Sequence, residues 1–117
     1  MRLNEVNYGT GTPVEGYGPG FFRVGAQRHE GAVLILPGAV ETWGGYEDTA
    51  VLTAAAEDID VLLVGTGAEI AHLPPLFRST METAGIGVEP MASPQACRTY
   101  NVLLGEGRRV AAALLPV

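Results

Sequence analysis

The stretch from residue 61 to residue 116 alternates between short apolar runs and helix-type patterns, and this order constrains the fold more than any other feature. Residues 61–64 are four consecutive apolar residues, which is typical of a strand that is covered on both faces. A helix pattern, a strand at residues 86–89, a second helix pattern and a strand at residues 108–115 follow. This order predicts an α/β fold with a parallel sheet, with residues 61–64 as its central strand and a cleft at the strand ends.

Both helix patterns are bounded by residues that begin or end helices. Pro75 suits the first turn of the first helix, and Gly85 suits its end. The buried face of this helix is expected to consist of Leu76, Phe77, Met81 and Ala84. In the second pattern Ser93 is the expected N-cap, and Gly105 is the expected stop. The buried arc of this second helix is expected to consist of Ala96, Tyr100, Leu103 and Leu104.

The first part of the chain carries weaker patterns. Residues 5–8 and residues 21–24 are candidates for short strands. Between them, residues 9–20 contain five glycines and two prolines, which is typical of a loop. We expect a permissive connection between strands here, and a mobile flap over a cleft is the alternative.

A β-hairpin is expected at residues 32–43. Its first half is apolar and rich in β-branched residues, and Pro37-Gly38 suits the centre of a type II turn. Trp43 is expected to pack in the core or at a sheet edge, and an exposed anchor for a partner is the alternative. After the hairpin, Asp48 is the expected N-cap of a helix that runs to about residue 57.

The size and composition of the chain suit one domain, residues 1–117. Hydrophobic residues make up 47% and charged residues 17% of the 117 residues, which indicates a soluble globular protein. No apolar run reaches the roughly 18 residues that a membrane-spanning helix needs. The first ten residues lack the pattern of a secretory signal peptide. We therefore expect a cytoplasmic protein without an integral membrane segment.

The charged residues exclude several classes of function. The net charge is −6, so a nucleic-acid partner is not expected. All seven basic residues are arginines, and the absence of lysine excludes a Walker phosphate loop, a Schiff-base enzyme and a pyridoxal-phosphate enzyme. Neither of the two serines, Ser79 and Ser93, lies in a G-x-S-x-G motif, which counts against a serine hydrolase.

The histidines and the cysteine show no pattern of a metal site. His29, His72 and Cys97 do not have the close spacings of zinc ligands, so we predict neither a metal nor another cofactor. His72 is expected in a loop as a surface or capping residue, and a catalytic histidine is the alternative. No residue is assigned a catalytic role.

The segment Gly65-Thr66-Gly67 directly follows the apolar run and resembles part of a dinucleotide-binding fingerprint. Glycines at a strand end let the backbone bend tightly and approach a ligand closely. Ile70 stands where the third glycine of the fingerprint belongs, and the next helix starts too late to bind a pyrophosphate at its first turn. We therefore expect a structural turn that lines a cleft rather than a nucleotide site.

The second helix would supply the other side of this cleft, through Cys97, Arg98 and Asn101. A cysteine near a helix N-terminus and next to an arginine can act as a nucleophile, although a packing role is more common for a free cysteine. Arg98 suits the surface or a salt bridge, and binding of an anion such as carboxylate or phosphate is the alternative. The candidate cleft residues are Gly65, Thr66, Gly67, Cys97, Arg98 and Asn101.

Several longer motifs resemble a known family. They are VLLVGTG at 61–67, LPP at 73–75, GIGVEPM at 85–91 and ACRTYNVLLGEGRRVAAALLP at 96–116. With the hairpin LILPGAVETW at 34–43, they resemble a small-domain family of unknown biochemical activity that includes the mitochondrial assembly factor of respiratory complex I. The resemblance implies a single-domain, three-layer α/β/α sandwich with a mixed, mostly parallel central sheet and an N-terminal β-hairpin region. It implies no catalytic residues, because the family has no agreed active site.

Two hypotheses on function follow. The first is a non-enzymatic protein-interaction module that assists the assembly or membrane insertion of another protein, with a protein partner still to be identified. The second is a domain that binds a small molecule or an anion, including a thiol-dependent enzyme, at the Gly-Thr-Gly/Cys97 cleft. The first is preferred, because a cleft at the strand ends is by itself a weak reason to expect chemistry.

Overall fold

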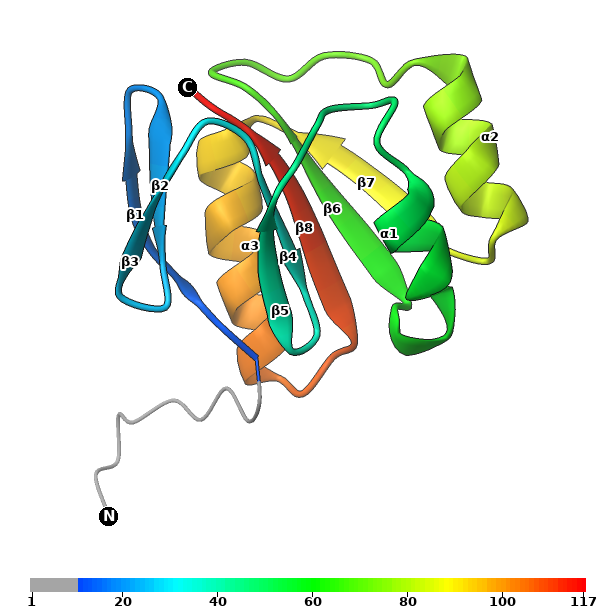
Figure 1. Cartoon of the computed structure of the whole chain (residues 1–117), viewed down its shortest axis with the longest axis horizontal. Helices are drawn as coiled ribbons and strands as arrows, with labels where there is room; N and C mark the ends of the chain where they lie inside the picture. Colours follow the sequence, from blue (N-terminus) through cyan, green and yellow to red (C-terminus); the bar gives the residue numbers. More distant parts are fainter. Residues whose placement is uncertain (1–10) are drawn as a thin grey trace.

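The computed structural model describes residues 11–117, which form two β-sheets, three α-helices and a short 3-10 helix (Figure 1). The strands are β1 Val14–Gly18, β2 Phe21–Val24, β3 Gln27–Glu30, β4 Val33–Leu36, β5 Ala39–Thr42, β6 Val61–Thr66, β7 Gly87–Met91 and β8 Val110–Leu115. The helices are α1 Ala50–Ala54, α2 Pro75–Thr83 and α3 Ser93–Gly105, and the 3-10 helix is Ala56–Asp58. From β6 to β8, strands and helices alternate as the sequence pattern predicts. No helix in residues 11–117 is long and apolar enough to cross a membrane.

The five-stranded sheet has the order β5-β4-β8-β6-β7 (Figure 1). β6 is parallel to both β8 and β7, whereas β4 is antiparallel to both β8 and β5. Four of the five strands therefore run in one direction, and the sheet is mixed and mostly parallel as expected. The prediction that residues 61–64 form the central strand is wrong, because β8 occupies the middle of the sheet. An apolar run indicates that both faces of a strand are covered, but not where the strand lies in the sheet. Both β6 and β8 carry such a run.

Helices cover both faces of this sheet, which confirms the three-layer α/β/α sandwich. On one face, Leu52 of α1 and the α2 residues Phe77 and Met81 belong to one core cluster. On the other face, Ala96 and Tyr100 of α3 belong to a second cluster together with residues of the small sheet β1-β2-β3. In Figure 1 the small sheet lies beside α3, at the end of the molecule opposite to α2.

Alanines in β8 let both layers lie close to the middle of the sheet. Ala111 and Ala113 belong to the cluster under α1 and α2, and Ala112 belongs to the cluster under α3. All three are fully buried. Successive side chains of a strand point to opposite faces. A run of small residues therefore lets the layers on both sides pack close to the sheet.

The small sheet is where the sequence patterns were least informative. Residues 9–20 were expected to be a loop, but β1 lies within them and pairs antiparallel with β2. Gly18 pairs with Phe21, and a Cβ on Gly18 would clash with the Phe21 ring. The glycine therefore makes room for this ring inside a strand. The predicted strand at 21–24 is confirmed as β2, whereas the candidate strand at 5–8 lies outside the described residues.

The predicted hairpin is confirmed. β4 and β5 pair antiparallel, and Gly38 adopts a φ of 82° in the turn between them, as a type II turn requires. Trp43, just after β5, is 3% exposed and lies in the core. The expected packing role of this residue is confirmed.

Two predicted helix caps are wrong, because their side chains bind elsewhere. The Asp48 carboxylate accepts a hydrogen bond from the Gly44 backbone N–H at 2.8 Å, and α1 begins only after Thr49. Ser93 is already the first residue of α3, and Pro94 follows it inside the helix. The hydroxyl of Ser93 binds two other segments of the chain, which are described below.

The ends of the two long helices depend on glycines with positive φ. After α2, Gly85 has a φ of 86°, and the Ile86 backbone N–H donates to Met81 O at 3.0 Å. The predicted stop of α2 is thus confirmed. After α3 the glycine with positive φ is Gly107, with a φ of 78°, and Gly105, the expected stop, is the last residue of the helix.

Candidate functional site

The structure brings the Gly65-Thr66-Gly67 segment into direct contact with the start of α3. The Gly67 backbone N–H donates to Ser93 Oγ at 2.9 Å, and the Ser93 backbone N–H donates to Gly67 O at 2.7 Å. Ser93 Oγ also donates to the Leu115 carbonyl oxygen at 2.5 Å. A Cβ on Gly65 would lie 2.6 Å from Ser93 Oγ, so the missing side chain of Gly65 leaves space for the start of α3. Ser93 is fully buried at this point.

Thr66 shapes the loop between β6 and α2. Its hydroxyl lies 2.7 Å from Glu69 O and 3.2 Å from Met91 O, and it accepts a hydrogen bond from the Ala71 backbone N–H at 3.0 Å. These contacts connect the end of β6 with the loop and with the end of β7. Thr66 thus stabilises the local backbone.

Cys97 lies inside the core. The side chain is 4% exposed and belongs to the cluster between α3 and the sheet. Burial raises the pKa of the Cys97 thiol from 9.0 to about 11, and the charge of Arg98 offsets only part of this effect. The thiol therefore stays protonated at neutral pH, and the packing role expected for this cysteine agrees with its position.

Arg98 and Asn101 have different surroundings. Arg98 is exposed, and its guanidinium donates to Gln95 Oε1 on the same helix at 3.0 Å. Asn101 binds the backbone of Val14 on β1 twice, because its Oδ1 accepts from the Val14 N–H at 2.8 Å and its Nδ2 donates to Val14 O at 2.7 Å. Asn101 therefore joins α3 to the small sheet. Binding of a ligand by the six candidate cleft residues stays a prediction.

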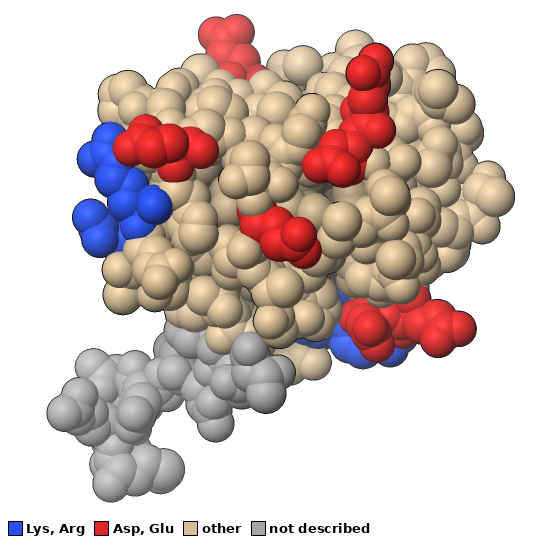
Figure 2. All heavy atoms as spheres, viewed as in Figure 1, with Lys and Arg blue, Asp and Glu red and all other residues tan. Residues whose placement is uncertain are grey.

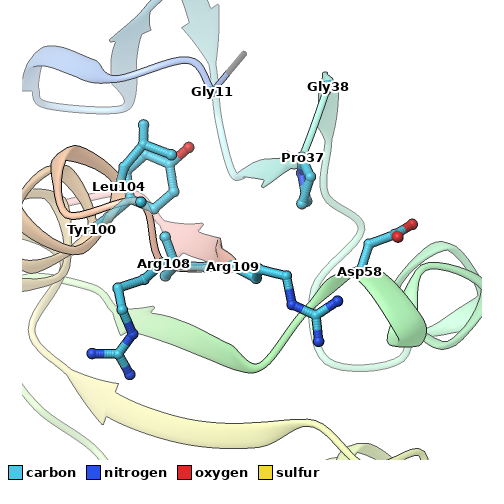
Figure 3. Close-up of a pocket in the computed structure, with 10 residues that line it drawn as sticks. Gly11, Pro37, Gly38, Asp58, Tyr100, Leu104, Arg108 and Arg109 are labelled. Atoms are coloured by element: carbon cyan, nitrogen blue, oxygen red, sulfur yellow. The ribbon is translucent and has the colours of Figure 1, made fainter. Parts of the chain in front are cut away.

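A cavity of about 490 Å³ lies at the other end of α3 (Figure 3). Its lining residues include Pro37 and Tyr100 and the adjacent arginines Arg108 and Arg109. Arg109 donates to both carboxylate oxygens of Asp60, at 2.7 and 3.2 Å, and to a backbone carbonyl. In Figure 3 the two guanidinium groups point in different directions. Arg109 is therefore paired with Asp60, whereas the Arg108 guanidinium lies apart from this ion pair.

A second, larger cavity lies between α2 and the segment that precedes α1, and we call it the aromatic groove. Its volume is about 680 Å³, and it is lined by Gly44, Tyr46, Glu47, Thr49, Pro74, Leu76, Phe77 and Thr80. The ring centroid of Tyr46 lies 5.5 Å from that of Trp43 and 5.2 Å from that of Phe77, both edge to face. The volume is in the range of natural binding pockets.

Hydrogen bonds hold the wall of the aromatic groove in place. The Trp43 indole N–H donates to Asp48 O at 3.1 Å, and the Asp48 carboxylate accepts from the Gly44 N–H. The Asp48 backbone N–H donates to Gly45 O at 2.9 Å. Residues 43–48 are therefore a compact turn that is fixed at both ends.

Leu76 corrects the prediction of the buried face of α2. Phe77 and Met81 are buried as expected, and Ala84 packs against the same core, but Leu76 is 78% exposed. Leu76 lies about 100° around the helix axis from Phe77, and in α2 this rotation turns its side chain away from the sheet and toward solvent. The groove was not predicted, because residues 44–49 and 74–80 meet only through tertiary packing. The adjacent bulky residues Leu76 and Phe77 were the signal that could have indicated it.

The chain is similar to proteins of known sequence. A profile of the family described as "Protein of unknown function (DUF498/DUF598)" matches residues 14–115. An uncharacterized protein of Rhodobacter capsulatus is 48% identical over 117 residues, which are 100% of this chain and 94% of that protein. The NADH dehydrogenase (ubiquinone) 1 alpha subcomplex assembly factor 3 of Danio rerio is 34% identical over 123 residues, covering 99% of this chain and 71% of that protein.

The fold is also similar to solved structures. The solution NMR structure of a Bordetella pertussis protein, described as a Mth938-like domain, has a TM-score of 0.78 and 32% sequence identity. The similarity covers 99% of this chain and 92% of that one. The arrangement of sheets and helices described above is therefore shared with this domain.

Proposed function

The chain belongs to the DUF498/DUF598 family of proteins of unknown function, and from this premise we propose that it is a non-enzymatic protein-binding module that assists the assembly of a larger protein complex. The relative from Danio rerio is named as an assembly factor and matches 99% of this chain. That similarity is the observation that carries the proposal. The matched 99% of this chain includes all of its described helices and strands.

The geometry of the chain supports binding rather than chemistry. The cysteine that could serve as a nucleophile is buried with a raised pKa. The buried hydroxyl of Ser93 is bonded to backbone groups at Gly67 and Leu115. In contrast, an aromatic groove with an exposed leucine at its border is open to solvent. Exposed apolar patches with polar residues around them are found at sites that bind other proteins.

The proposal is tested in the organism from which the gene comes. The gene is deleted, and membrane complexes, including NADH dehydrogenase, are compared by native gel electrophoresis and quantitative mass spectrometry. We expect the deletion to lower the abundance of at least one assembled complex, and the tagged chain to co-purify with a subunit of it. An unchanged set of complexes together with no stable partner would contradict the proposal.

A further inference from the structure

Leu76 is a large apolar residue that the fold leaves uncovered at a groove. It is 78% exposed, whereas its neighbour Phe77 is 2% exposed and forms part of the same groove. Burying an exposed leucine side chain is favourable in free energy, because it removes apolar surface from water. An apolar side chain of a partner that covers Leu76 would recover part of this free energy on binding.

The aromatic groove needs little rearrangement to bind. Tyr46 is held between Trp43 and Phe77 by edge-to-face contacts, and the Asp48 carboxylate and carbonyl fix the turn that carries Tyr46. Rigid aromatic residues contribute contact area with a small loss of conformational entropy, which favours affinity. The groove is therefore suited to an inserted side chain rather than to a flat contact.

The charge around the aromatic groove selects the chemistry of the partner. Glu47 is exposed and is the charged residue among the lining residues, none of which is basic. Arg78, the arginine of α2, does not line the groove and lies 3.9 Å from Glu82 as an i,i+4 pair. The chain as a whole carries a net charge of −6. In Figure 2 much of the surface over α1 and α2 is uncharged, and acidic residues lie next to it toward the middle of the view and, beside basic residues, at its lower edge.

We propose that the aromatic groove binds a segment of a partner protein in which a large apolar side chain stands next to an arginine or lysine. The apolar side chain contacts Leu76 and Phe77, and the basic residue faces Glu47. Opposite charges across an interface steer association and select the partner, while the apolar contact supplies most of the affinity. This inference rests on the proposed function, because it names the chemistry of the partner that the module binds.

The first experiment maps what occupies the groove. A photo-crosslinking amino acid is introduced in place of Thr80, which lines the groove, in the full chain in its native host. The same group in place of Val102 is the control, because Val102 is 59% exposed on α3, in the opposite layer. We expect the Thr80 position to cross-link a partner segment that contains a large apolar residue beside an arginine or lysine, and the Val102 position not to cross-link it.

The second experiment measures affinity with a labelled synthetic peptide of the cross-linked segment. We expect Leu76→Ser to weaken binding by about tenfold or more, as for a central apolar contact. Glu47→Gln is expected to weaken it by about threefold at low salt and less at high salt. Val102→Ser should leave the affinity unchanged. Circular dichroism and thermal unfolding check that each variant is folded.

Several outcomes would overturn the inference. These are a cross-linked segment without a basic residue, an adduct with the mass of a lipid or a small molecule, cross-linking to a second copy of this chain, or equal affinity for Leu76→Ser and the wild type. A partner that co-purifies but cross-links only through Val102 also overturns the inference, while it leaves the proposed function standing. If no partner is found by either route, the proposed function itself fails.

Discussion

Gly65 lies so close to Ser93 that a methyl group on Gly65 would be 2.6 Å from the Ser93 hydroxyl oxygen and 3.0 Å from its Cα. The same methyl group would lie 2.9 Å from a methyl carbon of Leu114. The end of β6 and the start of α3 are therefore in contact, and only a residue without a side chain fits between them. Gly65, the first glycine of the Gly-Thr-Gly segment, therefore allows α3 to pack against the end of β6.

The first prediction concerns this contact. Gly65→Ala should lower the free energy of unfolding by about 1–3 kcal/mol, because the added methyl group overpacks a site that includes backbone atoms. Urea denaturation followed by circular dichroism measures the change. Gly16→Ala is the matched control: it lies in β1 with a negative φ, and no atom is within 4 Å of a Cβ built there. Equal stability of the two variants would contradict the packing role of Gly65.

The second prediction concerns the hydroxyl of Ser93. Ser93→Ala removes the acceptor of the Gly67 N–H and the donor to Leu115 O at a fully buried position. We expect a loss of about 1–3 kcal/mol in the free energy of unfolding, because buried polar groups are left unpaired. Ser79→Ala, at an exposed position of α2, should change stability by less than about 0.5 kcal/mol. A Ser93→Ala variant as stable as the wild type would show that these hydrogen bonds contribute little.

The order of elements from β6 to β8 was predictable, because each element carries its own local signal. The apolar run of β6, the prolines in the first turns of α2 and α3 and the glycine after α2 all follow local rules. The small sheet was harder, because β1 is rich in glycine and β3 has the sequence Gln-Arg-His-Glu. Such strands form because neighbouring strands pair with them, and a short stretch of sequence carries no signal of this pairing.

The roles of single polar residues were less predictable than the elements. Asp48 and Ser93 both suit a helix N-cap by residue type, but Asp48 binds the Gly44 N–H in a local turn. Ser93 binds backbone groups that the tertiary structure brings close. The Gly-Thr-Gly segment and α3 were predicted to line one cleft, and the structure places them side by side, with Gly67 hydrogen-bonded to Ser93 at the start of α3. The aromatic groove depends on Tyr46 and Phe77, which are far apart along the chain.

The third prediction tests the alternative of a thiol-dependent enzyme. With a pKa of about 11, the Cys97 thiol is almost fully protonated at pH 8. Its alkylation by iodoacetamide should therefore be slower than that of a free cysteine in water by about a hundredfold or more. The rate should rise to that of a free cysteine when the protein is unfolded in urea. An apparent pKa below about 8.5 in the folded protein would favour the enzyme hypothesis instead.

The raised pKa of the Cys97 thiol also predicts how the stability of the protein depends on pH. Because folding raises the pKa of the Cys97 thiol from 9.0 to about 11, the unfolded state releases its proton first as the pH rises. The contribution of this group to the free energy of unfolding is fully present below pH 9 and is lost between pH 9 and about pH 11. Wild-type stability should fall more steeply over this range than that of Cys97→Ala. If the free energy of unfolding of the two proteins changed with pH in parallel, the raised pKa of Cys97 would be contradicted.

The central claim is that this domain acts by holding a partner at the aromatic groove, and complementation of the deletion strain tests it most directly. The abundance of the complex that depends on the wild-type chain is measured in strains that carry the wild type, Leu76→Ser or Val102→Ser at equal protein levels. We predict full restoration by the wild type and by Val102→Ser, and at most partial restoration by a folded Leu76→Ser variant. Full restoration by Leu76→Ser would contradict the claim.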